Sequence, residues 1–280
     1  MTVGIIGLGL MGASFGRAVN KNGGIAYGYD LSPDVNQKAE LLGAIRGILD
    51  EEKAKEIDLL VIATYQNDFY ASAKKYFKAM KSGATVMDFC GNKRTIARDM
   101  QKLSKEFPFV NFVGGHPMAG REVSGIDNSL SSLYDGASMI FTPVKADIET
   151  LDNLKKYFLN LGFKEVVITT PENHDKNIAY TSQLCHIVSN AYIKSPTAEN
   201  HFGYSAGSYR DLTRVARLSP EMWTDLMIAN SDNLSLELDC LIKNLEKYLS
   251  ALKEKDENKL KELLKEGNDR KIKIDKGKLE

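Results

Sequence analysis

The N-terminal segment constrains the fold of this chain more than any other part. An apolar run at Val3–Ile6 leads into the sequence Gly7-Leu8-Gly9-Leu10-Met11-Gly12, and a helical pattern follows. A second apolar run, Ile25–Tyr29, then ends in Asp30. This order of strand, glycine turn, helix, strand and acid is the full context in which the pattern GxGxxG indicates a dinucleotide-binding unit.

The three glycines of the turn have separate physical tasks. Gly7 permits the tight turn, Gly9 lets the backbone approach a pyrophosphate, and Gly12 lets the helix pack closely on the strand. The helix N-terminus offers free N–H groups and the positive end of its dipole to phosphates. We therefore predict that the whole turn binds the cofactor: Gly7, Leu8, Gly9, Leu10, Met11 and Gly12. The alternative is a glycine-rich turn that binds no nucleotide.

Asp30 selects among dinucleotides. A carboxylate at this position accepts hydrogen bonds from the 2′-hydroxyl of the adenosine ribose and repels a 2′-phosphate. The residues that follow it, Leu31-Ser32-Pro33, include no cation that could hold such a phosphate. The predicted cofactor is therefore NAD rather than NADP. The alternative is a turn or N-cap acid before a helix that begins at Pro33.

The balance of charge argues against nucleic acid as a partner. The chain has 37 Lys and Arg residues and 37 Asp and Glu residues among 280, so it lacks the basic excess of a nucleic-acid-binding protein. Its apolar runs stay short of about 18 residues, so we expect no membrane span. The first predicted strand begins almost at the N-terminus, so we expect no signal peptide. Three cysteines without metal-ligand spacing favour the cytoplasm and no metal site.

Alternating strands and helices continue beyond the first unit. Further apolar runs with the composition of buried strands lie at 58–63, 84–88, 109–113, 138–142 and 164–168, and a helix is expected near 148–161. We therefore predict an α/β, Rossmann-type, doubly wound parallel sheet over residues 1–168 as the dinucleotide-binding domain.

The pattern changes at Thr169. Thr170-Pro171 has the composition of an N-cap and first helical residue, and we expect helices at about 171–194, 207–217, 219–250 and 256–266. Leucine and isoleucine recur at three- and four-residue steps from Leu234 to Leu252, as on an amphipathic helix. We predict an all-α substrate and dimerisation domain over residues 169–280, and hence a homodimer. The charged stretch from Lys253 is expected to be solvated.

A histidine marks the expected ligand edge of the sheet. His116 lies in the sequence Gly114-Gly115-His116-Pro117-Met118-Ala119-Gly120, just beyond the predicted strand at 109–113. Ligands of open parallel sheets bind at the carboxyl ends of the strands. An imidazole that titrates near neutrality can take the proton of an alcohol there as hydride leaves. The alternative is a loop histidine that fixes a turn.

These motifs together resemble the prephenate dehydrogenase family. The matching segments span nearly the whole chain: the glycine turn, Asp88–Lys93, GGHPMAG around His116, His174-Asp175, and Arg210-Asp211-Leu212-Thr213-Arg214 followed by Trp223. The resemblance implies an NAD-binding N-terminal domain and a helical, dimerising C-terminal domain. It also implies that His116 is catalytic and accepts the hydroxyl proton of prephenate while hydride passes to NAD⁺. Loss of CO₂ then gives 4-hydroxyphenylpyruvate, a step of tyrosine biosynthesis.

The substrate implied by the resemblance is a dicarboxylate and requires cations. Arg210 and Arg214 lie four residues apart and would share one helix face. Guanidinium groups pair bidentately with carboxylates, and the match to the family makes Arg214 the first candidate for a substrate carboxylate and Arg210 the second. Either could instead form a structural ion pair, for example with Asp211 or Glu221.

A polar stripe marks the first C-terminal helix. Ser182, His186, Ser189 and Asn190 fall on one face of an otherwise apolar helix. Because buried polar groups need partners, we expect His186 and Ser182 to line the substrate site. The alternative is a hydrogen-bond network between domains. His174 is expected to support the site rather than to touch the substrate.

Two positions depart from the family pattern. Many members have a serine in the segment after the strand at 84–88, and its hydroxyl assists the catalytic histidine, whereas this chain has Gly91 there. Cys90, Asn92 or a water could take over that task. Gln183 stands where some relatives have a second histidine, and an amide does not titrate near neutrality.

Three other functions stay open at this point. An arogenate dehydrogenase of the same family would need an acid for the amine of its substrate, and Glu122 follows the His116 loop. Another β-hydroxyacid or imine dehydrogenase would usually have a lysine at the reacting centre and would lack GGHPMAG. A non-catalytic NAD-sensing relative would need neither His116 nor the two arginines.

Overall fold

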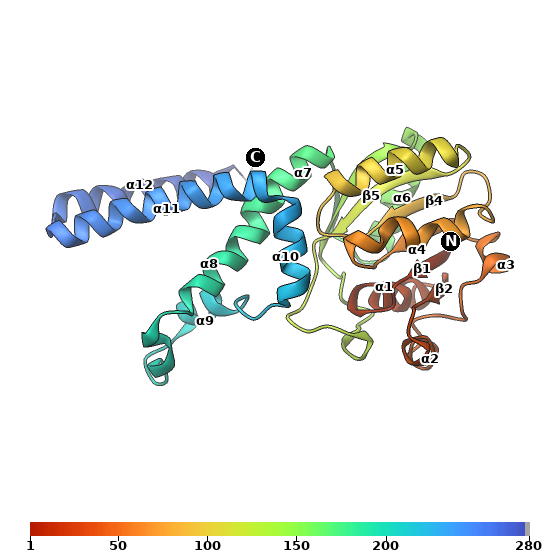
Figure 1. Ribbon diagram of the computed structural model, residues 1–280, viewed down its shortest axis with the longest axis horizontal. Coiled ribbons are helices and arrows are strands. Elements are labelled where there is room, and N and C mark those ends of the chain that lie inside the picture. Colours follow the sequence, from red (N-terminus) through yellow and green to blue (C-terminus); the bar gives the residue numbers. More distant parts are fainter. Residues whose placement is uncertain (278–280) are drawn as a thin grey trace. The chain divides into compact units, whose positions relative to one another are not determined.

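A seven-stranded sheet organises the N-terminal part of the chain (Figure 1). Its strands, in the order in which they lie side by side, are β2 (Ile25–Tyr29), β1 (Thr2–Ile6), β3 (Leu59–Ile62), β4 (Thr85–Asp88), β5 (Asn111–Pro117), β6 (Ser138–Lys145) and β7 (Glu165–Ile168). The computed structural model describes residues 1–277. Residue contacts divide the chain into two compact units, Met1–Asn230 and the part from Ser231 onward, and each is described by itself.

Strands β1 to β5 run parallel, whereas β6 lies antiparallel to β5 and parallel to β7. The predicted doubly wound sheet is confirmed, with β6 and β7 running opposite to the other strands. A parallel neighbour requires a crossover, usually a helix. The segment between Pro117 and Ser138 has only the short 3-10 helix η2 (Ile126–Asn128). This segment has no crossover helix and returns to the sheet at the edge where β5 ends, so β6 runs antiparallel to β5.

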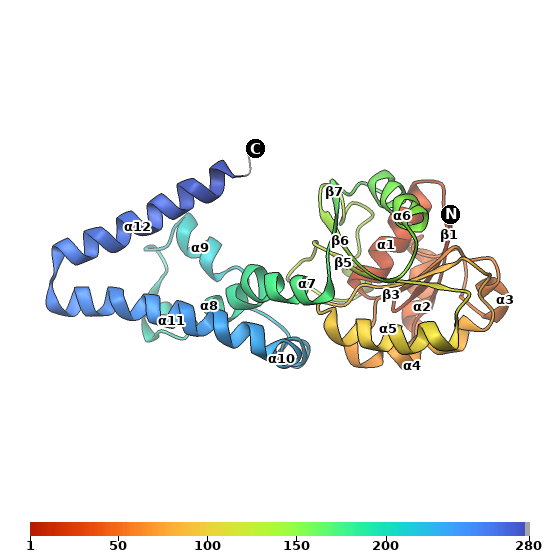
Figure 2. The ribbon, with the colours of Figure 1, turned by 90° about the horizontal axis from the view of Figure 1, so that it is seen from above.

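Helices cover both faces of the sheet (Figure 2). On one face lie α1 (Leu10–Lys21) and α6 (Ile148–Asn160), whose residues Phe15 and Phe158 belong to one core cluster. The opposite face is covered by α4 (Phe69–Phe77) and α5 (Arg94–Glu106). The shorter helices α2 (Pro33–Leu41) and α3 (Glu51–Ala54) and the 3-10 helix η1 (Gln66–Asp68) lie in the connections around β3.

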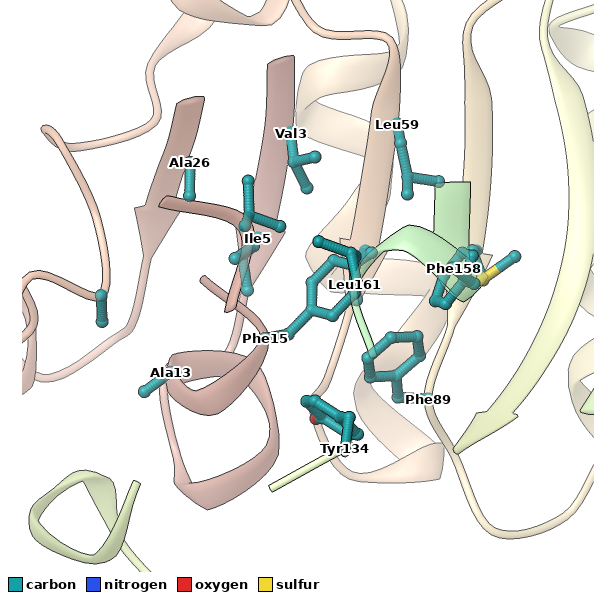
Figure 3. Close-up of a cluster of buried hydrophobic side chains, with 14 of the residues drawn as sticks. Val3, Ile5, Ala13, Phe15, Ala26, Leu59, Phe89, Tyr134, Phe158 and Leu161 are labelled. Carbon is teal, nitrogen blue, oxygen red and sulfur yellow. The ribbon is translucent and has the colours of Figure 1, made fainter. Parts of the chain in front are cut away.

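Aromatic packing joins the core to the glycine turn (Figure 3). The ring centroid of Phe15 lies 5.1 Å from that of Phe89, 5.6 Å from that of Phe158 and 6.1 Å from that of Tyr134. Each such pair stabilises the core by about 0.5–1.5 kcal/mol beyond the burial of its area. The Tyr134 hydroxyl donates a 2.8 Å hydrogen bond to the carbonyl of Met11. The core therefore also fixes the first turn of α1.

Beyond β7, every described element is helical. The first of these elements form one continuous helical rod, which consists of α7 (Pro171–Ile178), a π-helical turn η3 (Ala179–Gln183) and α8 (Leu184–Tyr192). Thr170 caps α7, because its hydroxyl accepts a 3.2 Å hydrogen bond from the N–H of Asn173. The 3-10 helix η4 (Pro196–Asn200), α9 (Gly207–Thr213) and α10 (Pro220–Ala229) complete the first unit.

The second unit is a hairpin of α11 (Ser231–Glu254) and α12 (Glu257–Lys276) (Figure 2). The single helix predicted over 219–250 is wrong, since the structure breaks it at Asn230, and α12 is longer than predicted. The added residues, 267–276, include three lysines and one arginine, which favour a helix. Ion pairs four residues apart, Glu266 with Arg270 and Lys271 with Asp275, support the added length. Leu249 and Leu252 are 50% and 60% exposed, so α11 keeps an apolar stripe on its surface. None of the described helices is long and apolar enough to cross a membrane.

Candidate active site

The turn after β1 is shaped by its glycines. Gly7 has φ of +86°, and a Cβ there would lie 2.6 Å from the carbonyl oxygen of Ala63. A Cβ on Gly12 would lie 1.9 Å from the carbonyl oxygen of Gly7, so α1 approaches the turn at a distance that only glycine permits. A Cβ on Gly9, by contrast, would meet nothing within 4 Å. Gly9 therefore borders the open space that a pyrophosphate requires in front of a helix N-terminus.

Asp30 is held against the glycine turn. Its Oδ2 accepts a 2.8 Å hydrogen bond from the N–H of Leu8, and its Oδ1 accepts one of 3.0 Å from the N–H of Ser32. The N-cap of α2 is Ser32, whose hydroxyl accepts from the N–H of Val35. Because an ionised carboxylate has about four acceptor positions, Asp30 keeps capacity for the hydroxyls of a ribose.

His116 lies inside β5, one residue before its end, rather than beyond the strand as the sequence predicted. The strand is longer because His116 and Pro117 pair with Ile140 and Met139 of β6. The preceding Gly115 packs closely on the neighbouring strand, where a Cβ would lie 2.8 Å from the carbonyl oxygen of Asp88. The imidazole is therefore carried by a central strand near its carboxyl end.

A buried ion pair joins β4 to the start of α5. Lys93 Nζ donates to the carboxylate of Asp88 and, at 2.7 Å, to the carbonyl of Cys90. Asp88 also accepts hydrogen bonds from the N–H groups of Cys90 at 2.9 Å and Gly115 at 3.1 Å. Loss of either partner would leave an unpaired buried charge, at a cost of several kcal/mol. The pair therefore favours the arrangement in which β4, β5 and the start of α5 meet at Asp88. It also puts a cation close to His116.

A chain of hydrogen bonds runs from His116 into α7. Nδ1 of His116 lies 2.9 Å from Nε2 of His174, and Nδ1 of His174 lies 2.7 Å from Oδ1 of Asp175. Asp175 also accepts hydrogen bonds from the N–H groups of Lys93 at 2.7 Å and Arg94 at 3.0 Å. His174 and Asp175 are both buried. The strand that carries His116 is thus tied to the first helix beyond the sheet.

Burial and nearby charge keep His116 neutral. Burial lowers the pKa of His116 well below 6.5, and Lys93 and His174 lower it further. Burial also lowers the pKa of His174, against the opposing effect of Asp175. For Asp175, burial works to raise the pKa, but hydrogen bonds from His174, Arg94 and Lys93 outweigh it and hold that pKa below its ordinary value. A neutral imidazole near an ionised carboxylate is the state that a general base requires.

Gly91 faces a leucine of α10. A Cβ at position 91 would lie 3.0 Å from Cδ2 of Leu226. The backbone carbonyl of Leu226 accepts hydrogen bonds from the side-chain amides of Asn92 at 2.8 Å and Gln183 at 3.3 Å. These two amides therefore fix α10 above the position where many relatives have a serine.

Hydrogen bonds link these side-chain amides to Asp175, the last residue of the hydrogen-bond chain that begins at His116. Asn230 Nδ2 lies 2.8 Å from both Oε1 of Gln183 and the carbonyl oxygen of Asp175. Gln183 Nε2 in turn donates to Oδ1 of Asn92 at 3.0 Å. Since Gln183, Asn92 and Asn230 are all buried, this network must be satisfied internally. It links the segment after β4, η3 and the end of α10.

The polar stripe of α8 is used mainly for contacts within the helical segments. Nδ1 of His186 lies 3.0 Å from the carbonyl oxygen of Val215, and its ring centroid lies 3.8 Å from that of Trp223. Burial lowers the pKa of His186, although the Val215 carbonyl opposes this effect. A neutral His186 that donates through Nδ1 leaves Nε2 as an acceptor. Ser182 is half-buried one turn earlier on the same rod.

The two candidate arginines are exposed in this structure. The guanidinium of Arg214 pairs with the carboxylate of Glu122, and the two side chains are 65% and 39% exposed. Glu122 lies on the loop after β5, so the pair brings Arg214 to the segment that follows His116. Arg210 lies one turn earlier on α9. Exposed ion pairs contribute only about 0–1 kcal/mol, so another carboxylate can replace Glu122 at little cost.

Two domain models describe this chain. The model of the prephenate dehydrogenase nucleotide-binding domain matches residues 15–177, and that of the prephenate dehydrogenase dimerization domain matches residues 170–266. This chain belongs to the prephenate dehydrogenase family. The expected resemblance is thereby confirmed, and the chain is an oxidoreductase of that family.

Individual members of the prephenate dehydrogenase family match over nearly the whole chain. The prephenate dehydrogenase of Bacillus subtilis is 29% identical, over 96% of this chain and 74% of its own length. The structure of prephenate dehydrogenase from A. aeolicus in complex with hydroxyphenyl propionate and NAD⁺ superposes with a TM-score of 0.83 at 31% identity, over 98% of each chain. Synechocystis arogenate dehydrogenase superposes with a TM-score of 0.80 at 25% identity, over 98% of this chain and 100% of its own.

In this member of the prephenate dehydrogenase family, two residues of the site have no assigned role from the sequence alone. Lys93 ends a motif segment, yet nothing in the pattern reveals that its ammonium is buried against Asp88. Asn230 interrupts an apolar helical pattern, and that interruption is the one available signal of a buried polar residue. Among the described residues, no group of His, Cys, Asp and Glu could hold a metal ion.

Proposed function

We propose that this enzyme catalyses the NAD-dependent oxidative decarboxylation of prephenate to 4-hydroxyphenylpyruvate. The observation that carries the proposal is the hydrogen-bond chain from Asp175 through His174 to Nδ1 of His116. It leaves Nε2 of His116 as the acceptor at the edge of the sheet where ligands bind. Family membership and the ligands named for the A. aeolicus structure, hydroxyphenyl propionate and NAD⁺, support the same assignment.

The N-terminal turn fits a dinucleotide. Gly9 borders open space, and the N–H groups of Leu10, Met11 and Gly12 begin α1 without intrahelical partners. These groups would hold the pyrophosphate, with Gly7 shaping the turn and Asp30 accepting hydrogen bonds from the ribose. When bound, NAD⁺ accepts hydride from C4 of the substrate. His116, the proposed proton acceptor, lies near the carboxyl end of β5, at the same edge of the sheet as the turn after β1.

The chain's residues then handle the proton. Nε2 of His116 takes the proton of the C4 hydroxyl as hydride leaves that carbon. The carboxylate attached to the ring then departs as CO₂, and the electrons of the broken C–C bond restore the aromatic ring. The C4 oxygen, left as a phenolate, takes the proton back from His116, which gives 4-hydroxyphenylpyruvate and returns the imidazole to its neutral state. A positioned general base of this kind accelerates a reaction by about 10²–10⁴-fold.

The substrate carboxylates require the cations and donors of the helical part. Arg214 is the first candidate because it reaches the segment after His116, where its partner Glu122 is exchangeable. Arg210 is the second, one turn away on α9. His186, whose ring lies against Trp223, and the half-buried Ser182 would complete the wall of the site.

Arogenate is the second candidate substrate, and Glu122 is the observation that favours it. Its carboxylate lies beside the arginine proposed for substrate binding, so it could accept hydrogen bonds from the amine that arogenate has in place of the keto group. A Glu122→Gln variant should then lose activity with arogenate more than with prephenate. An unchanged ratio of the two activities would exclude this role of Glu122.

We also propose that the enzyme is a homodimer, with the cytoplasm as its compartment. Apolar side chains of the helical part stay exposed in the single chain, with Phe202 79% and Tyr204 92% exposed. Tyr204 borders a cavity of about 880 Å³ between α8, η4 and α9. A second copy of the chain is the occupant that the matched dimerization domain favours. Sedimentation analysis of wild type and Tyr204→Ser would show a dimer that the variant weakens; a monomeric wild type would refute the proposal.

The first test is NADH formation, followed by its absorbance, with NAD⁺ and NADP⁺ each paired with prephenate and arogenate. Rapid NADH formation from prephenate is the expected result. A His116→Asn variant should bind NAD⁺ like the wild type and lose turnover by about 10²–10⁴-fold. The absence of turnover in all four combinations, with NAD⁺ binding confirmed by titration, would overturn the proposed reaction.

A further inference from the structure

The structure raises the question of what orients His116 in a chain without the family's serine. Gly91 has no side-chain donor, and Leu226 lies above it. Asn92 is not free to reach His116, because its amide bonds to the carbonyl of Leu226 and to Gln183. Cys90 directs its thiol to the carbonyl of Thr64 at 3.7 Å. Neither neighbour of Gly91 therefore replaces the serine.

The direction of the hydrogen bonds follows from Asp175. Its carboxylate accepts hydrogen bonds from the backbone N–H groups of Lys93 and Arg94 and from the guanidinium of Arg94 at 3.2 Å. An ionised carboxylate can only accept, so Nδ1 of His174 must carry a proton. Neutral His174 then has Nε2 as its acceptor, and Nδ1 of His116 must donate to it. The proton of neutral His116 is thereby confined to Nδ1, and Nε2 keeps its lone pair.

We propose that His174 is the positioning residue that holds His116 in its base-competent tautomer and orientation, in place of the hydroxyl that many relatives have at the position of Gly91. This inference deepens the proposed dehydrogenase function and rests on it for the effect on turnover. The placement of the proton on His116, however, depends only on the contacts among His116, His174 and Asp175. His174 itself does not touch the reacting atoms.

Other charged groups around the pair favour the same state. From the segment between β4 and α5, Asp88 and Lys93 form their buried pair, and from α7, Asp175 faces His174. The guanidinium of Arg94 is held by Asp175. The Lys93 cation opposes a second positive charge on either imidazole. The two rings are therefore both neutral at neutral pH, which is the condition under which the tautomer matters.

Substitutions at His174 can separate the two hydrogen bonds. A glutamine amide oxygen can reach the position of Nε2 and accept from His116, whereas an asparagine is too short to do so. We expect His174→Gln to retain kcat within about 5-fold, and His174→Asn and His174→Ala to lower it by about 10–100-fold. The KM for prephenate and the affinity for NAD⁺ should stay within about 2-fold in all of them. Lys176→Ala, an exposed change on the same helix, is the matched control.

Nitrogen-15 NMR of the histidine rings tests the proposal without turnover. The chain has 4 histidines, so His116 can be assigned by substitution. We expect His116 to be protonated at Nδ1 in the wild type and in His174→Gln, and to shift toward the Nε2–H form in His174→Asn and His174→Ala. Protonation of wild-type His116 at Nε2, or an unchanged kcat in a folded His174→Ala, would overturn the proposal. The expected NMR result without prephenate turnover would instead refute only the proposed reaction.

Discussion

Asp30 accepts a 2.8 Å hydrogen bond from the backbone N–H of Leu8 through Oδ2. The acid that is proposed to read the ribose therefore also fixes the second residue of the glycine turn. Recognition of the sugar and the shape of the phosphate site are coupled through one carboxylate. Changes at Asp30 should consequently affect more than the choice between NAD and NADP.

We predict that Asp30→Ala lowers the preference for NAD⁺ over NADP⁺ and also weakens binding of both cofactors. Loss of the carboxylate removes its repulsion of a 2′-phosphate, while the free N–H of Leu8 loosens the turn. Fluorescence titration of each cofactor measures both effects. Asp30→Asn, which keeps an acceptor for Leu8, should change specificity with a smaller loss of affinity. Better binding of NADP⁺ than NAD⁺ by the wild type would contradict the role of Asp30.

Arg214 should act through substrate binding rather than through chemistry. We expect Arg214→Ala to raise the KM for prephenate by about 10–100-fold, the effect of losing a charge-assisted hydrogen bond of about 1.5–3 kcal/mol. Steady-state kinetics at saturating NAD⁺ measure it, with Arg210→Ala as the comparison on the same helix. An effect confined to NAD⁺ affinity would remove Arg214 from the substrate site.

The histidines predict a loss of stability in mild acid. Burial lowers the pKa values of His116, His174 and His186 from 6.5 in the folded state. Above that pH both the folded and unfolded chains have neutral imidazoles, and as the pH falls below it the unfolded chain takes up protons first. The free energy of unfolding should therefore decrease from about pH 6.5 downward.

Thermal unfolding between about pH 7.5 and about pH 5.5 measures this effect, in a range above the titration of most carboxylates. His174→Gln should show a smaller decrease in Tm over the same range, because one of the three groups no longer titrates. A Tm that is constant, or that rises as the solution is acidified, would contradict the assignment of imidazoles that are neutral in the folded protein. The acid limb of kcat/KM should likewise lie below pH 6.5 if His116 is the base.

Gly91 and Leu226 should be energetically coupled. A Cβ at position 91 would lie 3.0 Å from Cδ2 of Leu226, so Gly91→Ser overpacks the contact and should cost about 1–3 kcal/mol. In Leu226→Ala the same serine has room, and its cost should fall. Denaturant unfolding of the two single variants and the double variant gives the coupling, which we expect to be about 1 kcal/mol. Additive effects would show that Leu226 does not occupy the serine's space.

The sequence was most informative where the determinants are local. The glycine turn, β1, α1 and β2 are specified within one short stretch, and the structure places each where the pattern predicted it. The contact between His116 and His174 joins residues 58 positions apart, so no local periodicity contains it. The antiparallel β6 likewise depends on a pairing with β5. That pairing also extends β5 through His116. Because the sequence does not reveal the pairing, it predicted His116 to lie just beyond the strand.

Asn230 illustrates the same limit. Its neighbours have helical composition on both sides, so the expected helix ran through it. Its buried amide instead bridges Asp175 and Gln183, which lie on another helical rod. Hydrogen bonds between side chains of distant elements thus determine where this helix is interrupted. Helix propensity, which depends only on local sequence, does not predict the interruption.

The π-helical turn Ala179–Gln183 sets the phase of the rod that leaves the sheet. On an ideal α-helix, eight residues separate Asp175 from Gln183 by about 80° beyond two full turns. The wider turn reduces that rotation, and one amide, Asn230, reaches both residues. Deletion of a single residue here would turn α8, with His186, away from α7, with His174, by about 100°. The π-helical turn thus fixes the rotation of His186, proposed to face the substrate, relative to His174, proposed to position the base. The length of the chain at this turn is therefore part of the proposed site, although none of its residues is assigned to the chemistry.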